Sequence, residues 1–363
     1  MAKGEASKKP DKAGLGDVLF EPEGGKAEVD IIFVHGLGGD RIETWTWRDK
    51  TEKTFWPKDL LPKDCPTARI LSFGYNADFA KFYPDNAETI APELTIDDYS
   101  TSLLEALKVL RGDTDSNRPI IFVAHSMGGL VVANALSRSY GTDVAKQGIA
   151  DQTIGTLFLG TPFEGSAKAK YASIALAIVK YVLVTQPASL SDLEERSRKL
   201  TDINHSFAQF LQRRDRSQDK PHLEVACFFE ERPMRKPMGF IVPKESATWL
   251  GVDAQSIQAN HVGMCKFEDE FGSDYKSVAG KLSQWVKDIE KNKKADKKGG
   301  VGGVNAESIG VVMGDVDNRG VYNHQGLVMG HAYGTSENAN RFIGHIGSVS
   351  YGNNQPPASG GLL

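Results

Sequence analysis

Short apolar runs alternate with amphipathic segments along most of the chain. Several runs are rich in Val, Ile, Leu and Phe and are too short for a helix, which is typical of buried strands. The expected strands begin at Asp30, Ala68, Pro119, Thr153 and His222. Because these runs alternate with helical patterns, the sequence predicts an α/β fold with a mostly parallel sheet and right-handed crossovers.

Two segments show helical spacing most clearly. Residues 95–111 carry leucines three or four positions apart and aspartates in the first turn, where the helix dipole favours negative charge. Residues 275–289 repeat the apolar spacing, with lysines on the outer side. A third helix is expected after Ser126, ending near Tyr140, and residues 239–243 are expected to form an edge strand.

A strand-to-helix turn at Ser126 is the feature around which the other candidate residues gather. The apolar strand that starts at Pro119 runs into a small-x-Ser-x-Gly turn, whose small residues are Ala124 and Gly128. Such a turn exposes a serine hydroxyl to a base, and the small residues let strand and helix pass closely. The pattern predicts that Ser126 is a nucleophile. The simpler alternative is a buried strand followed by a serine-capped helix.

A glycine-rich loop at residues 35–39 follows the first strand. It lacks both the G-x-G-x-x-G spacing and the Lys-Ser/Thr pair of phosphate-binding loops. A loop without bulky side chains can instead direct a backbone N–H at a developing oxyanion. We expect the N–H groups of Leu37 and Met127 to be the two donors, and His35 to order the loop by hydrogen bonding.

A serine nucleophile needs a base, and an acid that orients the base. The strand that begins at His222 ends in two carboxylates, of which Glu230 is the expected acid and Glu231 the alternative. An acidic pair at a strand end also simply marks the return of the chain to solvent. His261 precedes the last helix, where a base is expected, whereas His205 and His222 lie in a helical segment and at a strand start. The order serine, acid, histidine agrees with that of the α/β-hydrolases.

Composition excludes some classes of function. The net charge of -4 and the lack of a basic helix face give no case for nucleic-acid binding. The three cysteines lack metal spacing, so reduced thiols in a reducing compartment are expected. The aromatic residues between Trp45 and Pro57 are open to two interpretations, since they either line an acyl pocket or pack in the core.

Composition also divides the chain into segments. Residues 1–15 carry lysines and no apolar core, which predicts disorder rather than a signal peptide or a membrane anchor. Residues 16–291 are the expected α/β domain, in which 166–220, an apolar stretch followed by a charged one, is expected to form a helical cap over the site. Residues 292–303 are a Lys/Gly-rich linker, and 304–363 form a Gly/Asn-rich tail.

Short pieces of the tail recur. Val-Met-Gly at 312–314 returns at 328–330, and Asn-Arg at 318–319 returns at 340–341. A weak repeat of short strands with Gly and Asn corners suits a stacked β-solenoid whose edges pair with another copy. The alternative is a disordered low-complexity tail. A tail peptide that stays monomeric and shows no β signal after prolonged incubation would rule out assembly.

Several motifs together resemble a known family. They are Phe33 to Gly39, Phe55-Trp56-Pro57, Ala124 to Leu130, Phe158 to Pro162, Phe228-Phe229-Glu230 and Asn260 to Lys266. In this number and order they are similar to the lipase-like serine esterases of fungi, which occur as effectors of nucleotide-binding immune receptors, and to the phosphatidylglycerol-remodelling serine-active-site proteins. The resemblance covers about residues 28–290. It implies an α/β-hydrolase fold, Ser126 as nucleophile, His261 as base, an acid at Glu230, and no cofactor.

The leading hypothesis is a serine ester hydrolase that acts on a lipid or another acyl ester through an acyl-enzyme. The alternative is a catalytically silent scaffold whose tail recruits partners. The resemblance adds an effector role in fungal immune signalling and cell death, with a tail similar to amyloid signalling motifs that assembles with a nucleotide-binding receptor. A cytoplasmic protein is expected, and two alternatives stay open, namely free cytosol and peripheral contact at a mitochondrial or endoplasmic reticulum membrane. The chain departs from the family at Phe163-Glu164, where His-Arg is usual, so the substrate stays open.

Overall fold

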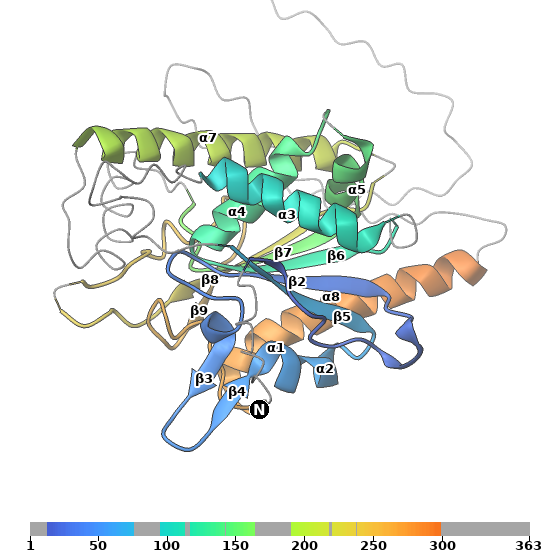
Figure 1. The fold of residues 1–363 in the computed structure, drawn as a ribbon, viewed down its shortest axis with the longest axis horizontal. Coiled ribbons are helices and arrows are strands. Elements are labelled where there is room, and N and C mark those ends of the chain that lie inside the picture. Colours follow the sequence, from blue (N-terminus) through green and yellow to red (C-terminus); the bar gives the residue numbers. More distant parts are fainter. Residues whose placement is uncertain are drawn as a thin grey trace, which may run out of the picture. The chain divides into compact units, whose positions relative to one another are not determined.

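A seven-stranded sheet forms the centre of the described structure (Figure 1). The computed structural model describes residues 13–75, 95–112, 117–141, 143–163, 190–217, 220–236 and 238–298, without the side chains of 190–197 and 294–298. The strand order is β1-β5-β2-β6-β7-β8-β9. The strands are β1 (Gly14–Leu15), β2 (Val29–Val34), β5 (Ala68–Gly74), β6 (Ile120–His125), β7 (Thr153–Leu159), β8 (Glu224–Glu230) and β9 (Gln255–Ile257), and a separate hairpin is made of β3 (Thr46–Arg48) and β4 (Lys53–Phe55).

Neighbouring strands from β5 to β9 run parallel, whereas β1 joins β5 antiparallel. The expected α/β fold with a mostly parallel sheet is therefore confirmed. Strand residues alternate between two buried clusters, with Ile32 and Val34 in one cluster and Ile31 and Phe33 in the other. Because both faces are buried, these strands read as continuous apolar runs rather than as alternating ones.

Helices cover both faces of the sheet (Figure 1). On one face lie α3 (Ile96–Arg111), α4 (Met127–Arg138), α5 (Val144–Gln152) and α7 (Leu190–Asp215), and on the other α1 (Trp56–Asp59), α2 (Leu61–Asp64) and α8 (Ser273–Lys298). The 3₁₀ turns η1 (Glu23–Gly25) and η2 (Glu43–Trp45) complete the elements. The helices expected at 95–111, after Ser126 and at 275–289 are thus confirmed. In the part of the chain that the structure describes, no helix has the length and apolar character needed to cross a bilayer.

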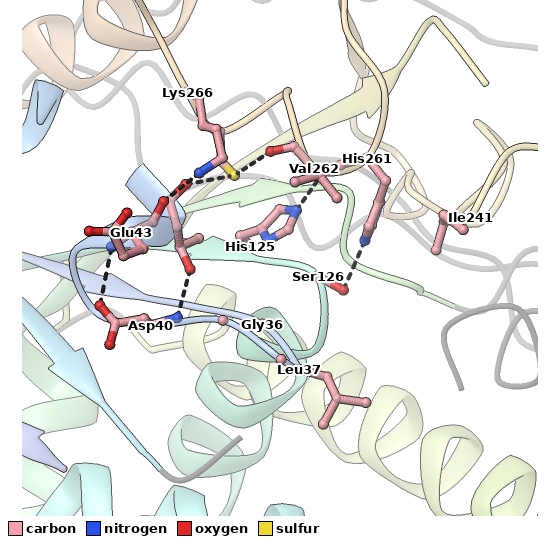
Figure 2. A pocket seen from close by; sticks show the side chains of 14 residues that line it. Gly36, Leu37, Asp40, Glu43, His125, Ser126, Ile241, His261, Val262 and Lys266 are labelled. Carbon is pink, nitrogen blue, oxygen red and sulfur yellow. Dashed lines mark hydrogen bonds between the residues drawn. The ribbon is translucent and has the colours of Figure 1, made fainter. Parts of the chain in front are cut away.

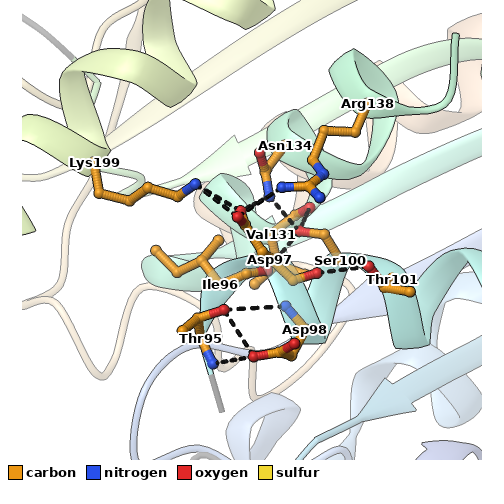
Figure 3. Close-up of polar contacts among 10 residues, drawn as sticks. All are labelled: Thr95, Ile96, Asp97, Asp98, Ser100, Thr101, Val131, Asn134, Arg138 and Lys199. Carbon is orange, nitrogen blue, oxygen red and sulfur yellow. Dashed lines mark hydrogen bonds and ion pairs between the residues drawn. The ribbon is translucent and has the colours of Figure 1, made fainter. Parts of the chain in front are cut away.

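One carboxylate joins three helices of the same face (Figure 3). Asp97 of α3 accepts a hydrogen bond from Asn134 Nδ2 at 2.9 Å and pairs with Arg138 at 2.6 Å, and both partners lie on α4. Lys199 of α7 pairs with the same carboxylate at 2.7 Å. Partial burial raises the pKa of Asp97, but the bonds from these three partners outweigh burial and hold the pKa below its ordinary value. The carboxylate therefore fixes α4, which begins directly after Ser126, against α3 and α7.

The predicted cap at 166–220 is wrong for its second half. Residues 190–215 form α7, which connects β7 to β8 and buries Leu200, Ile203 and Phe207 in the cluster that also holds the apolar face of α4. Their spacing of three and four positions makes one stripe of the helix apolar, and the sheet-covering layer is where that stripe is buried. This helix therefore belongs to the body of the fold, and residues 164–189 lie outside the described residues.

Two predicted segment boundaries also shift. Gly14 and Leu15, assigned to a disordered N-terminus, pair with β5, because Leu15 packs against the apolar core. At the other end, α8 continues to Lys298, so residues 292–298 of the predicted linker are helical. Residues 1–12 and the tail at 304–363 lie outside the described residues.

The edge strand expected at 239–243 is absent from the described structure. The segment makes one isolated bridge, between Met234 and Gly239, and the sheet ends instead at β9. The amides of Ile241 and Val242 donate to the side chain of Glu230 and not to a neighbouring strand. A tertiary partner thus replaces the ladder that the apolar pattern suggested.

A buried ion cluster lies where β2 and β5 begin. Asp30 is fully buried and pairs with Arg69 at 2.8 Å and with Arg111 at 2.7 Å, and Arg118 approaches to 3.2 Å. The cluster ties β2 to β5, to the end of α3 and to the segment before β6. It lies at the opposite end of β2 from His35, which follows the strand, so it is structural and remote from the loop at 35–39.

Candidate active site

Ser126 lies at the turn between β6 and α4 in a strained backbone conformation. Its φ of 52° makes it the one non-glycine residue at positive φ among the described residues. Such a conformation costs on the order of 1–3 kcal/mol and persists only where the surroundings impose it. A Cβ at Gly128 would lie 2.3 Å from the carbonyl oxygen of His35, and one at Gly129 would lie 2.0 Å from Thr161 Oγ1. The small residue expected at Gly128 is therefore required, and Gly129 is a second one that the sequence analysis did not single out.

The structure brings the three predicted residues of a triad together. His261 Nε2 lies 3.0 Å from Ser126 Oγ, and Figure 2 draws this hydrogen bond as a dashed line. His261 Nδ1 lies 3.6 Å from Glu230 Oε1, which is longer than a hydrogen bond. All three residues are buried, and His261 Nδ1 and Glu230 Oε2 have no hydrogen-bond partner among the described residues. A small approach of the two side chains is enough to close the second contact.

Glu230 is held by the backbone of the following loop. Its Oε1 accepts hydrogen bonds from the amides of Ile241 at 2.8 Å and Val242 at 2.7 Å. Burial raises the pKa of Glu230 to about 7, although these two amides and the backbone amide of His261 act in the opposite direction. Glu231, the alternative acid, is exposed, and its backbone amide donates to the carbonyl of Ile257 at 3.0 Å. The geometry therefore favours Glu230.

His261 is neutral at physiological pH. Burial, and then the neighbouring His125, lower its pKa well below the ordinary value. A neutral imidazole with its proton on Nδ1 leaves Nε2 free to accept the proton of Ser126 Oγ. The Nδ1 proton then points toward Glu230, so the imidazole has the form that proton transfer from Ser126 requires.

His35 orders the glycine loop, as predicted. Its Nδ1 lies 2.9 Å from the carbonyl oxygen of Gly36, and its Nε2 accepts the amide of Tyr75 at 3.3 Å. The Tyr75 hydroxyl donates to the carbonyl of His35 at 2.8 Å, and the two rings stack with centroids 4.5 Å apart. Within the described residues, neither Leu37 nor Met127 donates its amide to another group. Both amides are therefore available to a ligand.

A cavity of about 230 Å³ opens beside Ser126 (Figure 2). Its walls come from the glycine loop, the turn after it, the elbow and the two loops that carry Ile241 and His261. They are Gly36, Leu37, Gly38, Gly39, Asp40, Glu43, Thr44, His125, Ser126, Ile241, His261, Val262, Cys265 and Lys266. Cys265 hydrogen-bonds the carbonyl of Thr44, and burial raises its pKa to about 12, so it remains a thiol.

The aromatic residues between Trp45 and Pro57 pack in the core. Trp45 and Trp56 are fully buried against Phe33, and neither lines the cavity. Trp56 Nε1 donates to the carbonyl of Cys265 at 2.9 Å. The acyl-pocket interpretation is therefore wrong for these two residues, and Trp56 instead supports the loop that carries His261.

His125, the residue before the nucleophile, has a contact that the sequence analysis missed. Its Nε2 donates to the carbonyl of His261 at 2.8 Å, and the two imidazole rings lie 4.9 Å apart. Burial lowers the pKa of His125 to about 4, so the ring stays neutral. The signal in the sequence that could have indicated a role for His125 is its position directly before Ser126 in the turn. His125 is thus a positioning residue, which ties the loop of the base to the strand of the nucleophile.

We expect His125→Leu to lower kcat for a soluble ester by on the order of 10²-fold with little change in KM, because small displacements of a catalytic group cost about this much. His125→Gln keeps an N–H donor and is expected to recover most of the rate. Steady-state kinetics of both variants measure this, with circular dichroism as the folding control. Equal rates in the Leu and Gln variants would show that the hydrogen bond does not position His261.

Comparison with known proteins gives the class to which this chain belongs. Residues 31–261 match the model of the alpha/beta hydrolase family, and the chain belongs to that family. It is 29% identical over 259 residues to the protein SERAC1 of Homo sapiens, covering 66% of this chain and 36% of that protein. The Mus musculus SERAC1 is 30% identical over 261 residues, with the same coverage of 66% and 36%. The chain thus spans little more than a third of the length of these relatives.

Some solved structures are also similar to this chain. A fungal esterase from Rhizomucor miehei matches with a TM-score of 0.45 at 14% identity, covering 75% of this chain and 79% of that chain. A bacterial membrane phospholipase A matches with a TM-score of 0.39 at 12% identity, covering 74% and 82%. The expected α/β-hydrolase fold is confirmed by the family match and by the observed sheet.

Proposed function

We propose that this chain is a serine ester hydrolase that acts on a lipid or another acyl ester. The observation that carries the proposal is the 3.0 Å contact between Ser126 Oγ, at a strained turn, and the neutral His261 Nε2. A nucleophile within hydrogen-bond reach of a base, with a buried carboxylate behind the base, is the arrangement used in acyl transfer.

In the proposed reaction, His261 takes the hydroxyl proton as Ser126 Oγ attacks the ester carbonyl carbon. The carbonyl oxygen becomes an oxyanion, and the ionised Glu230 stabilises the imidazolium. His261 then protonates the leaving alcohol as the carbon–oxygen bond breaks. Water, deprotonated by His261, attacks the acyl-enzyme, and the acid leaves as Ser126 regains its proton.

The amides of Leu37 and Met127 are the proposed oxyanion donors. Met127 is the first residue of α4, so its N–H has no partner within the helix and lies at the positive end of the helix dipole. Leu37 belongs to the glycine loop that lines the cavity next to Ser126. Donors that are oriented before the reaction stabilise the developing charge without reorganising.

The size and walls of the cavity suggest how a lipid would bind. Leu37, Ile241 and Val262 provide apolar wall, next to the backbone groups of the glycine loop. The volume of about 230 Å³ is below the roughly 300–1,000 Å³ of pockets that enclose drug-sized ligands. The cavity therefore suits the ester and the first part of an acyl chain, and the rest of a lipid would stay outside.

Covalent labelling tests the proposal. A fluorophosphonate probe reacts with an activated serine, so digestion and mass spectrometry should locate the adduct on Ser126. The same protein should hydrolyse a short-chain aryl ester, and prior labelling should abolish the turnover. The catalytically silent scaffold, which is the alternative, predicts neither an adduct nor turnover, and that result would overturn the proposal.

We expect kcat/KM for the aryl ester to rise with pH through about 7 and then to level off. The reaction needs Glu230 as a carboxylate, and its pKa is raised to about 7, so deprotonation on the alkaline side switches the triad on. His261 is already neutral in this range because its pKa is lowered. In Glu230→Gln the rise near pH 7 should vanish, at a lower plateau. An unchanged profile in that variant would contradict the assignment of Glu230.

The proposed biological role extends to the tail. Its internal repeats motivate the proposal that residues 304–363 assemble with a nucleotide-binding receptor of fungal immunity and thereby switch on the hydrolase as an effector of cell death. The proposed location is cytoplasmic, with peripheral contact at a mitochondrial or endoplasmic reticulum membrane. These residues lie outside the described structure. Deleting them should spare hydrolysis and abolish the cellular effect.

A further inference from the structure

A loop at residues 231–246 follows Glu230 and lies beside the cavity. At its start, the amides of Glu231 and Arg232 donate to the carbonyls of Ile257 and Ala259, both at 3.0 Å. At its end, the carbonyl of Ser246 accepts the amide of Phe163 at 2.6 Å. Pro237 within it is not described. The loop is therefore anchored at its start to the end of β9 and the segment that leads to His261, and at its end to the segment that follows β7.

The loop has a small apolar interior of its own. Ile241 and Val242 are buried with Ala247, and Phe229 and Met234 pack against them. Ile241 also lines the cavity, where Figure 2 places it beside His261. These residues fill the interior of the loop, whereas the side chains of Met238 and Phe240 are exposed.

The outward side of the loop combines apolar and basic side chains. Met238 and Phe240 are 39% and 46% exposed, although both belong to residue types that are usually buried. The exposed cations of the loop are Arg232, Arg235, Lys236 and Lys244, and none forms an ion pair with a described residue. Lys244 lies 4.9 Å from the ring of Phe229. The only carboxylates of the loop, Glu231 and Glu245, stand at its ends.

We propose that the 231–246 loop docks the enzyme onto an anionic lipid bilayer. Exposed Phe and Met side chains enter the boundary between headgroups and acyl chains, and neighbouring cations bind the negative surface. The inference rests on the proposed function, because the cavity is too small to enclose a whole lipid. A loop that contacts the bilayer beside the cavity mouth lets the ester reach Ser126 while the rest of the lipid stays in the membrane.

The chemistry of the loop favours a bilayer over an acidic protein. Long cationic side chains can keep their charges at the headgroups while their carbon stems lie on apolar surface, so they act together with Phe240. An acidic protein would need the cations but would give Phe240 no apolar environment of its own. Removal of Phe240 therefore separates the two partners.

Vesicle sedimentation tests the proposal with the full chain. The wild type is expected to bind vesicles of phosphatidylcholine mixed with phosphatidylserine and to bind phosphatidylcholine alone far more weakly. Arg235→Ser with Lys236→Ser should lower the partition coefficient about 25-fold, since each basic residue near an anionic surface contributes roughly fivefold, or about 1 kcal/mol. Phe240→Ser should weaken binding to the same vesicles without changing the salt dependence.

A matched control separates the loop from the rest of the basic surface. Lys276 and Lys287 are exposed lysines of α8, which covers the sheet face opposite α4. Lys276→Ser with Lys287→Ser removes the same charge and should bind like the wild type. The difference between the two double variants therefore gives the contribution of the loop, apart from any general attraction between lysines elsewhere in the chain and an anionic surface.

Turnover of a soluble aryl ester distinguishes the two proposals. All loop variants should keep wild-type turnover, which also shows that they are folded. If the wild type hydrolyses the soluble ester but the two double variants bind vesicles equally, docking by the loop is wrong and the hydrolase stands. If vesicle binding depends on the loop and no ester is hydrolysed, the hydrolase is wrong. Binding that is lost with the cations but unaffected by Phe240→Ser would overturn the bilayer as partner and point to an acidic protein.

Discussion

Replacing Ser126 by alanine is expected to lower kcat/KM for a short-chain aryl ester by on the order of 10⁴- to 10⁶-fold. The variant keeps His261, Glu230 and the oxyanion amides, so KM should change little while the nucleophile is lost. In the described part of the chain, Ser126 Oγ is the one side-chain group bonded to His261 Nε2, at 3.0 Å. Initial rates at saturating and low ester concentration measure both parameters, and fluorophosphonate labelling should disappear in parallel.

The control for this experiment is the same substitution at a serine away from the site. Ser277 is exposed on α8, and among the described residues its hydroxyl bonds only the carbonyl of Ser273, at 3.0 Å. Ser277→Ala should therefore keep the wild-type rate. Hydrolysis by Ser126→Ala at the wild-type rate would show that another group carries the reaction.

Replacing Asp30 by asparagine is expected to lower the free energy of unfolding by about 3–5 kcal/mol, the usual cost of removing one partner from a buried ion pair. The change preserves the size of the side chain but removes the charge that faces Arg69, Arg111 and Arg118. The guanidinium groups would then repel one another in a place with little access to water. Denaturation in guanidinium chloride, followed by fluorescence and circular dichroism, measures the change.

An exposed carboxylate provides the comparison. Asp288 pairs with Lys291 at 3.1 Å on the surface of α8, where such pairs contribute about 0–1 kcal/mol. Asp288→Asn should therefore change stability by less than about 1 kcal/mol. If Asp30→Asn also lowers the free energy of unfolding by less than about 1 kcal/mol, the cluster at Asp30 does not stabilise the fold. Catalysis by folded Asp30→Asn should be unaffected, since Asp30 lies at the opposite end of β2 from His35 and the glycine loop.

The sheet and the elbow were predictable because local patterns determine them. Strands buried on both faces need continuous apolar runs, and the turn at Ser126 needs a small residue at Gly128, where a Cβ would meet the backbone of β2. The choice of Glu230 over Glu231 rested on position alone, and the structure brings Glu230 to His261. These features depend on residues close together in the chain, or on the order of the motifs.

Other features depend on partners that a sequence does not display. The pattern of α7 shows that Leu200 and Phe207 are buried, but not that they pack on α4 rather than over the site. The run that contains Ile241 has the composition of a strand, yet its amides donate to a side chain. His125 was missed because its partner, the carbonyl of His261, is a backbone atom far along the chain.

One oxygen of Glu230 serves both the catalytic base and the loop after β8. Glu230 Oε1 approaches the imidazole of His261 and also accepts hydrogen bonds from the amides of Ile241 and Val242. Those amides oppose the effect of burial on its proton affinity. A displacement of this turn by even one hydrogen-bond length would remove that opposition, and the acid would hold its proton more tightly. A movement of the Ile241–Val242 turn would thereby change the protonation of Glu230 at the catalytic centre.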